Sequence, residues 1–295
     1  TRCSYVTGVQ TCALPIYLSD EADPEVAFQE MIKAWFTQTL PILDSELYKC
    51  CVVKLSGTSY RYVALAHHLI MDGFGFANLV NNLASLYRDE VPEGEALAWQ
   101  EVVQNEQAYF QSKRFEKDAA FWKSYPLIDN EGLFIPYALS ERGNAQDKST
   151  RYTMALSQAQ VDNIQKVSEN CGIPVTSVYC TLMSVYLRLT YGRDALTLAL
   201  PVHNRKNKAQ RDMLGAFLSY SPVSLSIDEQ DSFASIAQKI MKTQKQMLRH
   251  QQYPLSQIVA DRDAAGLATP AFDLQFNYLK LDRALTFESG QSEIV

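Results

Sequence analysis

Hydrophobic and polar positions follow two different periods along the first half of the chain. Apolar residues within 25–39 recur every three or four positions, which predicts an amphipathic helix. Two apolar runs, 47–55 and 60–67, flank the turn sequence Ser-Gly-Thr-Ser and predict a β-hairpin. Helical spacing returns over 75–89, and again over 97–125 as one or two helices. The aromatic residues expected on the buried side of 97–125 are Trp99, Phe110, Phe121 and Trp122.

The second half repeats this succession of strands and helices. A polar, glycine-containing stretch at 126–150 is expected to be an interlobe linker, and 151–156 is expected to be a strand. Ser157 predicts the start of a helix that ends near Gly172, and the mostly apolar 174–191 predicts a helix buried on nearly all sides. Three further strands are expected at 195–202, 217–227 and 272–279, and a long helix is expected at 232–249. This alternation is typical of an α/β fold in two lobes, the second more complete.

Composition and charge narrow the class of protein. Apolar residues make up 47% and charged residues 20% of the 295 positions, the balance of an ordinary soluble globular protein. Lys and Arg number 27 against 33 Asp and Glu, so the formal charge of −6 disfavours nucleic acid or an anionic membrane surface as a partner. No apolar run approaches the roughly 18 residues that a membrane-spanning helix needs.

The first sixteen residues, TRCSYVTGVQTCALPI, read differently from the rest. They resemble the in-frame translation of a sequencing-adapter oligonucleotide, and we expect them to be a cloning or assembly scar, a natural disordered terminus being the alternative. The four cysteines outside this segment are expected to be small buried hydrophobes; they are Cys50, Cys51, Cys171 and Cys180. Since nothing indicates a disulfide framework, a cytoplasmic location is predicted.

The candidate chemistry centres on two adjacent histidines, His67 and His68, at the end of an apolar strand. Because side chains alternate along a strand, one imidazole is expected to point inward and the other toward a cleft. Asp72 and Gly73 follow, and a carboxylate beside a tight turn can fix the loop or join an ion pair. The dipeptide alone leaves open a buried structural histidine with a capping Asp, or a histidine acting as general base or positioning group.

Other kinds of site fit the sequence poorly. Adjacent histidines do not chelate from one strand face, and no Cys or Glu lies at ligand spacing, so no metal site is predicted. The sequence contains neither a GxSxG nucleophile pattern nor a GxxxxGK[ST] phosphate loop. Gly73-Phe74-Gly75 lacks the third glycine of a dinucleotide-binding motif. These nucleophile and cofactor patterns therefore fail.

Four segments follow one another in the order of a known family. HHLIMDG at 67–73 matches HHxxxDG, and LPVHNR at 200–205 resembles a PxxNR segment. Residues 213–222 resemble MxGxFxNxxP, and HQQYPLSQIV at 250–259 resembles a late helix–turn motif in the form found in catecholate-siderophore synthetases. The chain thus resembles the condensation domains of nonribosomal peptide synthetases, which belong to the chloramphenicol-acetyltransferase-like acyltransferase superfamily.

The resemblance implies an α/β fold of two chloramphenicol-acetyltransferase-like lobes in a V-shaped arrangement, with a tunnel between them. Two carrier proteins would bring thioesters on phosphopantetheine arms, and the acceptor's amine would attack the donor's thioester to form an amide. The implied partners are therefore these carrier proteins and adjacent synthetase domains. Phosphopantetheine would arrive with the carriers, and the resemblance implies no intrinsically bound cofactor.

The resemblance also implies roles for residues. His68 matches the family's functional histidine, which acts as a base or orients the amine, and His67 matches its structural neighbour. Asp72 matches an aspartate that the family pairs with an arginine, for which Arg205 is the best candidate. The remaining candidates are Gly73, supporting the site, and the tunnel-lining Asn204 and Asn277, the latter equally compatible with an outward-facing strand residue.

Several features depart from the family. Its first two motifs are absent, Tyr109-Phe110 only loosely echoes a YxDY motif, and Ser219 stands where Asn is usual. We therefore expect a fragment of a longer synthetase, shortened at both ends. Its expected parts are the scar at 1–16, a partial N-terminal lobe at 17–145 and an incomplete C-terminal lobe at 146–295. Such a fragment need not be active alone.

Three alternatives to amide formation on carriers stay open. A stand-alone acyltransferase of the same superfamily would take a soluble acyl-CoA, although the DFGWG segment of its plant-type branch is not in this sequence. A non-catalytic condensation-like module would only recruit partner proteins. An epimerisation domain also carries HHxxxDG.

Overall fold

The computed structural model describes residues 15–92, 97–128, 152–267 and 274–279. Contacts divide the chain into two compact units. The first unit contains the described part of Thr1–Ala96 together with Asn207–Phe217, and the second contains the described parts of Leu97–Lys206 and Leu218–Ala284. The expected lobe boundary at 145/146 lies outside the described residues, as do positions 1–14 of the expected scar.

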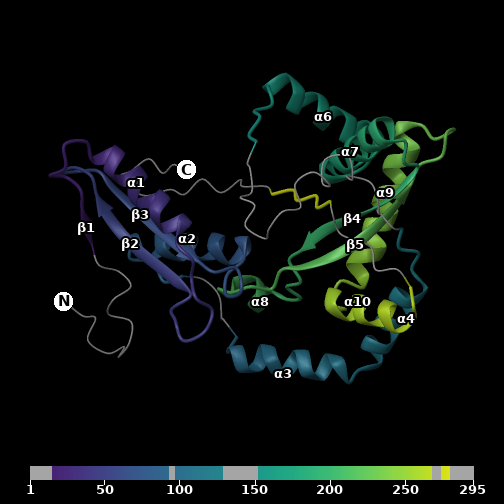
Figure 1. Ribbon diagram of the computed structural model, residues 1–295, viewed down its shortest axis with the longest axis horizontal. Helices are drawn as coiled ribbons and strands as arrows, with labels where there is room; N and C mark the ends of the chain where they lie inside the picture. Colours follow the sequence, from purple (N-terminus) through teal and green to yellow (C-terminus); the bar gives the residue numbers. More distant parts are fainter. Residues whose placement is uncertain (1–14, 93–96, 129–151, 268–273, 280–295) are drawn as a thin grey trace. The chain divides into compact units, whose positions relative to one another are not determined.

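The first unit is built on a three-stranded sheet with the order β1-β2-β3 (Figure 1). Strands β2 (Tyr48–Lys54) and β3 (Tyr60–Ala66) pair antiparallel, with Cys51 opposite Val63, so the predicted hairpin is confirmed. Strand β1 (Ile16–Tyr17) runs parallel to β2.

Helix α1 (Pro24–Thr37) covers one face of this sheet (Figure 1). It begins where the sequence predicts, because the side chain of Asp23 accepts hydrogen bonds from two backbone amides of the first turn. Its Phe28 packs against the buried Cys51 and Val53 of β2. Alternation along the strand leaves the opposite sheet face partly exposed, as at Val52.

The first unit also contains α2 (Gly73–Tyr87) and the short α8 (Lys208–Asp212), which contact each other. Helix α8 comes from the connection between two strands of the second unit, and the sequence pattern did not predict it.

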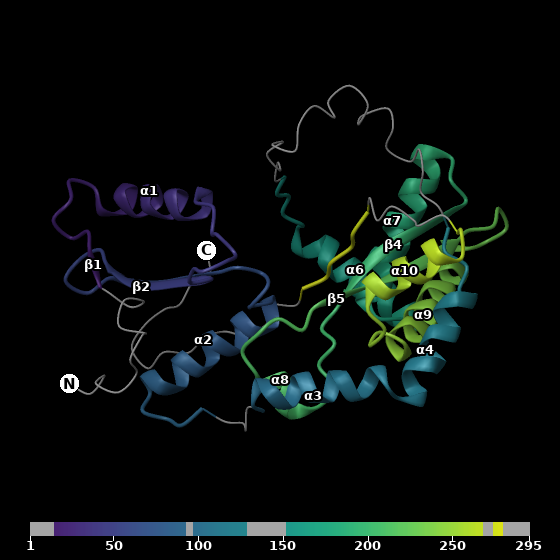
Figure 2. The same cartoon turned by 60° about the horizontal axis from the view of Figure 1, so that its bottom comes forward.

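The second unit is built around the antiparallel pair β4 (Ala195–Val202) and β5 (Ser219–Ser226). Six helices accompany this pair among the described residues: α3 (Trp99–Phe110), α4 (Lys113–Ser124), α6 (Gln158–Cys171), α7 (Val175–Tyr191), α9 (Phe233–Arg249) and α10 (Leu255–Ala264). Figure 2 shows α7 and α9 beside the two strands. The core of the second unit contains Leu196 and Leu198 of β4, Val223 of β5, Trp122 of α4 and Ile240 of α9.

Four interpretations of the pattern are corrected by the structure. Helix α7 is not buried on nearly all sides, because Leu182, Tyr186 and Leu189 on one of its faces are exposed. Tyr109, rather than Trp99 or Phe110, is the buried aromatic residue of α3. Residues 152–156, all described, form no strand and are mostly exposed. The described part of the last expected strand, 274–279, makes only an isolated parallel bridge from Gln275 to Ala199.

The structure describes a small part of the expected linker and all four of the cysteines outside the first sixteen residues. Most of the expected linker lies outside the described residues. Of the four cysteines, Cys51 and Cys180 are buried as predicted, whereas Cys50 and Cys171 are only half-buried.

Candidate functional site

The two histidines lie in the turn that joins β3 to α2. The turn begins at a fixed point, because the backbone amide of His67 donates to the carbonyl of Leu47, 2.7 Å away. The half-buried His67 ring points back into its own turn, where Nδ1 accepts a hydrogen bond from the amide of Leu69 at 3.1 Å. His68 is exposed. The two adjacent rings therefore have different environments, although both lie in the turn after β3 and not in the strand whose alternation was expected to separate them.

Asp72 fixes the other end of this turn. It is the N-cap of α2 and is 2% exposed. Its Oδ1 accepts from the amide of Gly75 at 2.7 Å, and its Oδ2 accepts from the amide of Phe217 at 2.8 Å. The backbone amide of Asp72 also donates to the carbonyl of Gly215. Two amides and a helix N-terminus stabilise the negative charge in a buried position.

Gly75 and Asn78, which sequence reasoning missed, bring the segment 207–217 onto the start of α2. A Cβ at Gly75 would lie 2.7 Å from the carbonyl oxygen of Gly215, so only glycine permits this approach. The side-chain amide of Asn78 donates to the carbonyls of Arg211 and Met213, at 2.5 and 3.1 Å. Since these acceptors lie about 135 residues away in sequence, no local pattern reveals the contact.

Arg205 lies directly after β4, in the second unit, whereas Asp72 belongs to the first. Arg205 is 3% exposed, and its backbone amide donates to Nδ1 of His203 at 3.1 Å. Between them Asn204 has a φ of 47°, a left-handed conformation that asparagine tolerates better than most residues. The pairing of Asp72 with Arg205 stays a prediction.

The two tunnel-lining candidates differ in exposure. Asn204 is half-buried, and Asn277 is exposed. Their role in a tunnel also stays a prediction, as does the supporting role of Gly73 at the first position of α2.

A second cluster of polar side chains lies inside the second unit, and we name it the Asp118 cluster: Tyr109, Arg114, Asp118 and His250. The fully buried Asp118 accepts hydrogen bonds from the Tyr109 hydroxyl at 2.9 Å and from Arg114 Nε at 3.0 Å, and its other oxygen lies 2.6 Å from His250 Nδ1. Phe121 stacks on the His250 ring with centroids 3.8 Å apart. Burial, and then the hydrogen bond to Asp118, raise the pKa of Tyr109. The sequence motif marked His250 but not its partners.

The described residues contain no group of three or more His, Cys, Asp or Glu side chains placed to hold a metal ion. None of their helices is both long enough and apolar enough to cross a membrane.

Comparison with known proteins places this arrangement in a family. The family model of the condensation domain matches residues 6–293. Surfactin synthase subunit 1 of Bacillus subtilis (strain 168) is 28% identical over 263 residues, which are 84% of this chain and 7% of that protein. Enterobactin synthase component F of Escherichia coli (strain K12) is 23% identical over 98% of this chain and 23% of its own length. The chain thus spans a small part of the curated relatives it matches.

Solved structures show the same fold. The first condensation domain of the CDA synthetase matches with a TM-score of 0.71 at 23% identity, over 93% of this chain and 62% of that one. VibH, a condensation enzyme of nonribosomal peptide synthesis, matches with a TM-score of 0.68 at 19% identity, over 88% of this chain and 62% of its own. These matches confirm the α/β, chloramphenicol-acetyltransferase-like fold expected from the sequence. With the family model matching nearly every residue, this chain belongs to the condensation-domain family of nonribosomal peptide synthetases.

Proposed function

We propose that this chain is the amide-forming domain of a nonribosomal peptide synthetase, and that His68 is its catalytic residue. The observation that carries the proposal is the His67–Gly73 turn: an exposed imidazole on a short loop whose two ends are both fixed by hydrogen bonds. Membership of the condensation-domain family supports the reaction class.

The reaction joins two thioester-bound substrates. The nitrogen of the acceptor's amine attacks the carbonyl carbon of the donor's thioester, the C–N bond forms, and the C–S bond breaks. The amine loses one proton and the departing thiolate gains one, so no oxidant or metal is needed. An imidazole beside the amine can take that proton or hold the amine in place, because its ordinary pKa lies near neutrality.

Asp72 has a different role in this proposal. Both carboxylate oxygens accept backbone amides, and the side chain is buried, so it is placed to shape the turn rather than to meet substrate. An ion pair with Arg205 would add to that structural role, since removing one partner of a buried pair leaves an uncompensated charge.

The substrates would arrive on carrier proteins as phosphopantetheine thioesters, and neighbouring synthetase domains would be further partners. The curated relatives are much longer synthetases, which supports both statements. We place the parent protein in the cytoplasm. Asn204 and Asn277 are proposed to line the path of the substrates.

The test is a condensation assay with donor and acceptor carrier proteins loaded with acyl and aminoacyl thioesters. We expect the chain to form an amide, and His68→Ala to reduce the rate by about 100-fold or more, the usual contribution of a positioned proton-transfer group. Amide formation that persists in His68→Ala, in a properly folded variant, would contradict the assignment.

Two controls sharpen this assay. His67→Ala removes a half-buried ring whose Nδ1 accepts a hydrogen bond from its own loop, so its effect should appear in the thermal unfolding midpoint more than in the rate of the folded protein. Replacing the loaded donor carrier by a free acyl-CoA should abolish product. Equal turnover of acyl-CoA would instead identify a stand-alone acyltransferase.

A further inference from the structure

Helix α9 has a strongly basic face in an otherwise acidic chain. Its 17 residues include Lys239, Lys242, Lys245 and Arg249 and no acidic residue, whereas the whole chain has a formal charge of −6. The apolar residues Ile236, Ala237, Ile240 and Met247 are buried on the opposite side of the helix. Four cations therefore occupy the side that does not pack on the core.

One of these cations is neutralised within the second unit. Lys239 Nζ lies 2.7 Å from Asp228 and 2.6 Å from Asp231. The hydrogen bond from Lys239, followed by those from the Ser235 hydroxyl and the Asp228 backbone amide, lowers the pKa of Asp231 to about 2, so Asp231 is charged at neutral pH. Lys239 therefore serves as an internal comparison for the rest of the face.

The other three cations form what we call the α9 basic face: Lys242, Lys245 and Arg249. In the part of the chain that the structure describes, their side chains make no ion pair. They are spaced three and four residues apart, the spacing at which like charges on a helix repel. The three charges thus weaken the isolated helix slightly and gain nothing within the described fold.

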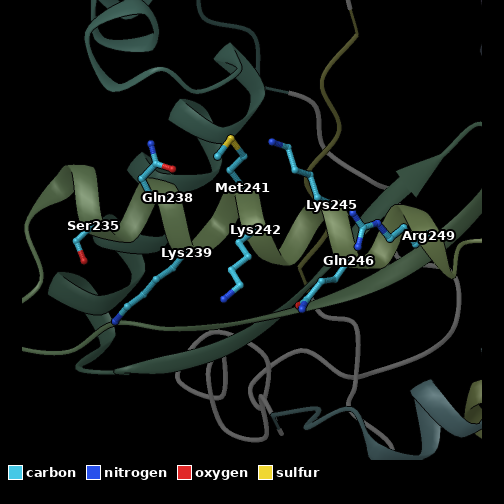
Figure 3. A pocket seen from close by; sticks show the side chains of 8 residues that line it. All are labelled: Ser235, Gln238, Lys239, Met241, Lys242, Lys245, Gln246 and Arg249. Atoms are coloured by element: carbon cyan, nitrogen blue, oxygen red, sulfur yellow. The ribbon is translucent and has the colours of Figure 1, made fainter.

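A groove runs along the same face (Figure 3). Its volume is about 700 Å³, and its described lining comes from α9 alone, between Ser235 and Arg249. The lining residues other than the four cations are Ser235, Gln238, Met241 and Gln246. Hydrogen-bonding and flexible side chains thus alternate with charged ones along the groove.

We propose that the α9 basic face binds an acidic segment of a protein, whose Asp and Glu carboxylates pair with Lys242, Lys245 and Arg249. The described lining is a row of side chains along one helix, which suits a protein segment that runs along that row. The net negative charge of the whole chain opposes a long polyanion such as a nucleic acid more than a short acidic segment, because a short segment interacts mainly with the charges next to it. This inference goes beyond amide formation and does not depend on it.

The test measures binding of the full chain to a fluorescein-labelled helical peptide of about 20 residues, with Glu at every fourth position on an Ala-rich background. Fluorescence anisotropy at low ionic strength should show binding that weakens as salt is added. The triple variant Lys242→Gln, Lys245→Gln, Arg249→Gln should raise Kd at least about tenfold. Its thermal unfolding midpoint should not fall, because the three side chains are exposed.

A matched control removes the same charge from exposed positions of another helix of the second unit. The triple variant Lys113→Gln, Lys117→Gln, Lys123→Gln changes α4 and should leave Kd unchanged. An equal loss of affinity for the peptide in the two triple variants would mean that only net charge matters and would overturn the proposal. So would the absence of binding, or tighter binding of an equally labelled single-stranded DNA of similar length. Amide formation is not measured, so failure here says nothing about the proposed reaction.

Discussion

Two buried carboxylates, Asp72 and Asp118, are stabilised in different ways. Asp72 accepts hydrogen bonds from the backbone amides of Gly75 and Phe217, which carry no charge and belong to the fold itself. Asp118 takes its bonds from the side chains of Tyr109 and Arg114 and lies against His250. A substitution at Asp118 therefore affects several side chains that are already buried or constrained.

Replacing Asp118 by Asn should destabilise the second unit by about 1–3 kcal/mol, the cost of disrupting hydrogen bonds to a buried charged group. The side-chain amide of Asn cannot neutralise the charge of Arg114. Its NH2 group would also place a hydrogen-bond donor against the Tyr109 hydroxyl and Arg114 Nε, which are donors themselves. The free energy of unfolding in urea checks this value. Glu116→Gln, an exposed change on the same helix, should leave that free energy nearly unchanged; equal effects of the two substitutions would contradict the prediction.

Asp118→Asn and Glu116→Gln should also differ in the pH at which the Tyr109 phenol ionises. The pKa of Tyr109 is raised from 10.0, first by burial and then by its hydrogen bond to Asp118. The neutral phenol is thus the form the fold favours, so its contribution to stability is complete below pH 10 and is lost as pH rises above 10. Asp118→Asn should bring phenolate formation to lower pH, as seen by ultraviolet absorbance, while Glu116→Gln should not.

At the residue scale, the sequence predicted the part of the site that a local motif contains. The run from His67 to Gly73 was found, and the capping role that Asp72 plays for α2 was one of the alternatives that the sequence left open. Phe217, which donates to the other oxygen of Asp72, is 145 residues distant. Asn78 and Gly75 belong to no motif, and only the folded chain shows what they contact.

At the scale of elements, α2 depends on close approach by the segment 207–217. Gly75→Ala should destabilise the first unit by about 1–3 kcal/mol, because a Cβ there would lie 2.7 Å from the carbonyl oxygen of Gly215 and 2.6 Å from the sulfur of Met71. Gly73→Ala is the matched control, since a Cβ at Gly73 meets nothing within 4 Å. Urea unfolding of both variants checks the difference, and similar losses would mean that crowding is not the cause.

Elements with local start and stop signals were predicted well. Helix α6 begins with a capping box at Ser157 and ends at Gly172 in a left-handed conformation, both readable from the sequence. The strand expected at 151–156 failed, because a strand also needs a partner, which no local pattern supplies. The exposed Leu189 of α7 shows the same limit: an apolar composition does not say which faces of a helix are covered.

At the scale of the whole molecule, the two units have cores of unequal size. The first unit's cluster of buried hydrophobic residues around Val53 has five members in the described chain, and the largest cluster of the second, around Leu198, has thirteen. Less buried apolar area gives lower local stability. Amides of β2 and β3 should therefore exchange with deuterium faster than those of β4 and β5, as measured by mass spectrometry. Slower exchange in the first unit would contradict this expectation.

The segment 207–217 also imposes an order on the synthesis of the protein. The first unit includes this segment, yet the ribosome completes the segment only 139 residues after Asn78 (217 − 78). At about 5–20 residues per second, that is a delay of roughly 7–28 seconds. Throughout this time the side-chain amide of Asn78 and the N-terminus of α2 lack these partners and are accessible to water and to chaperones. A nascent chain that stops before residue 207 lacks these partners, even though its HHxxxDG motif is already complete.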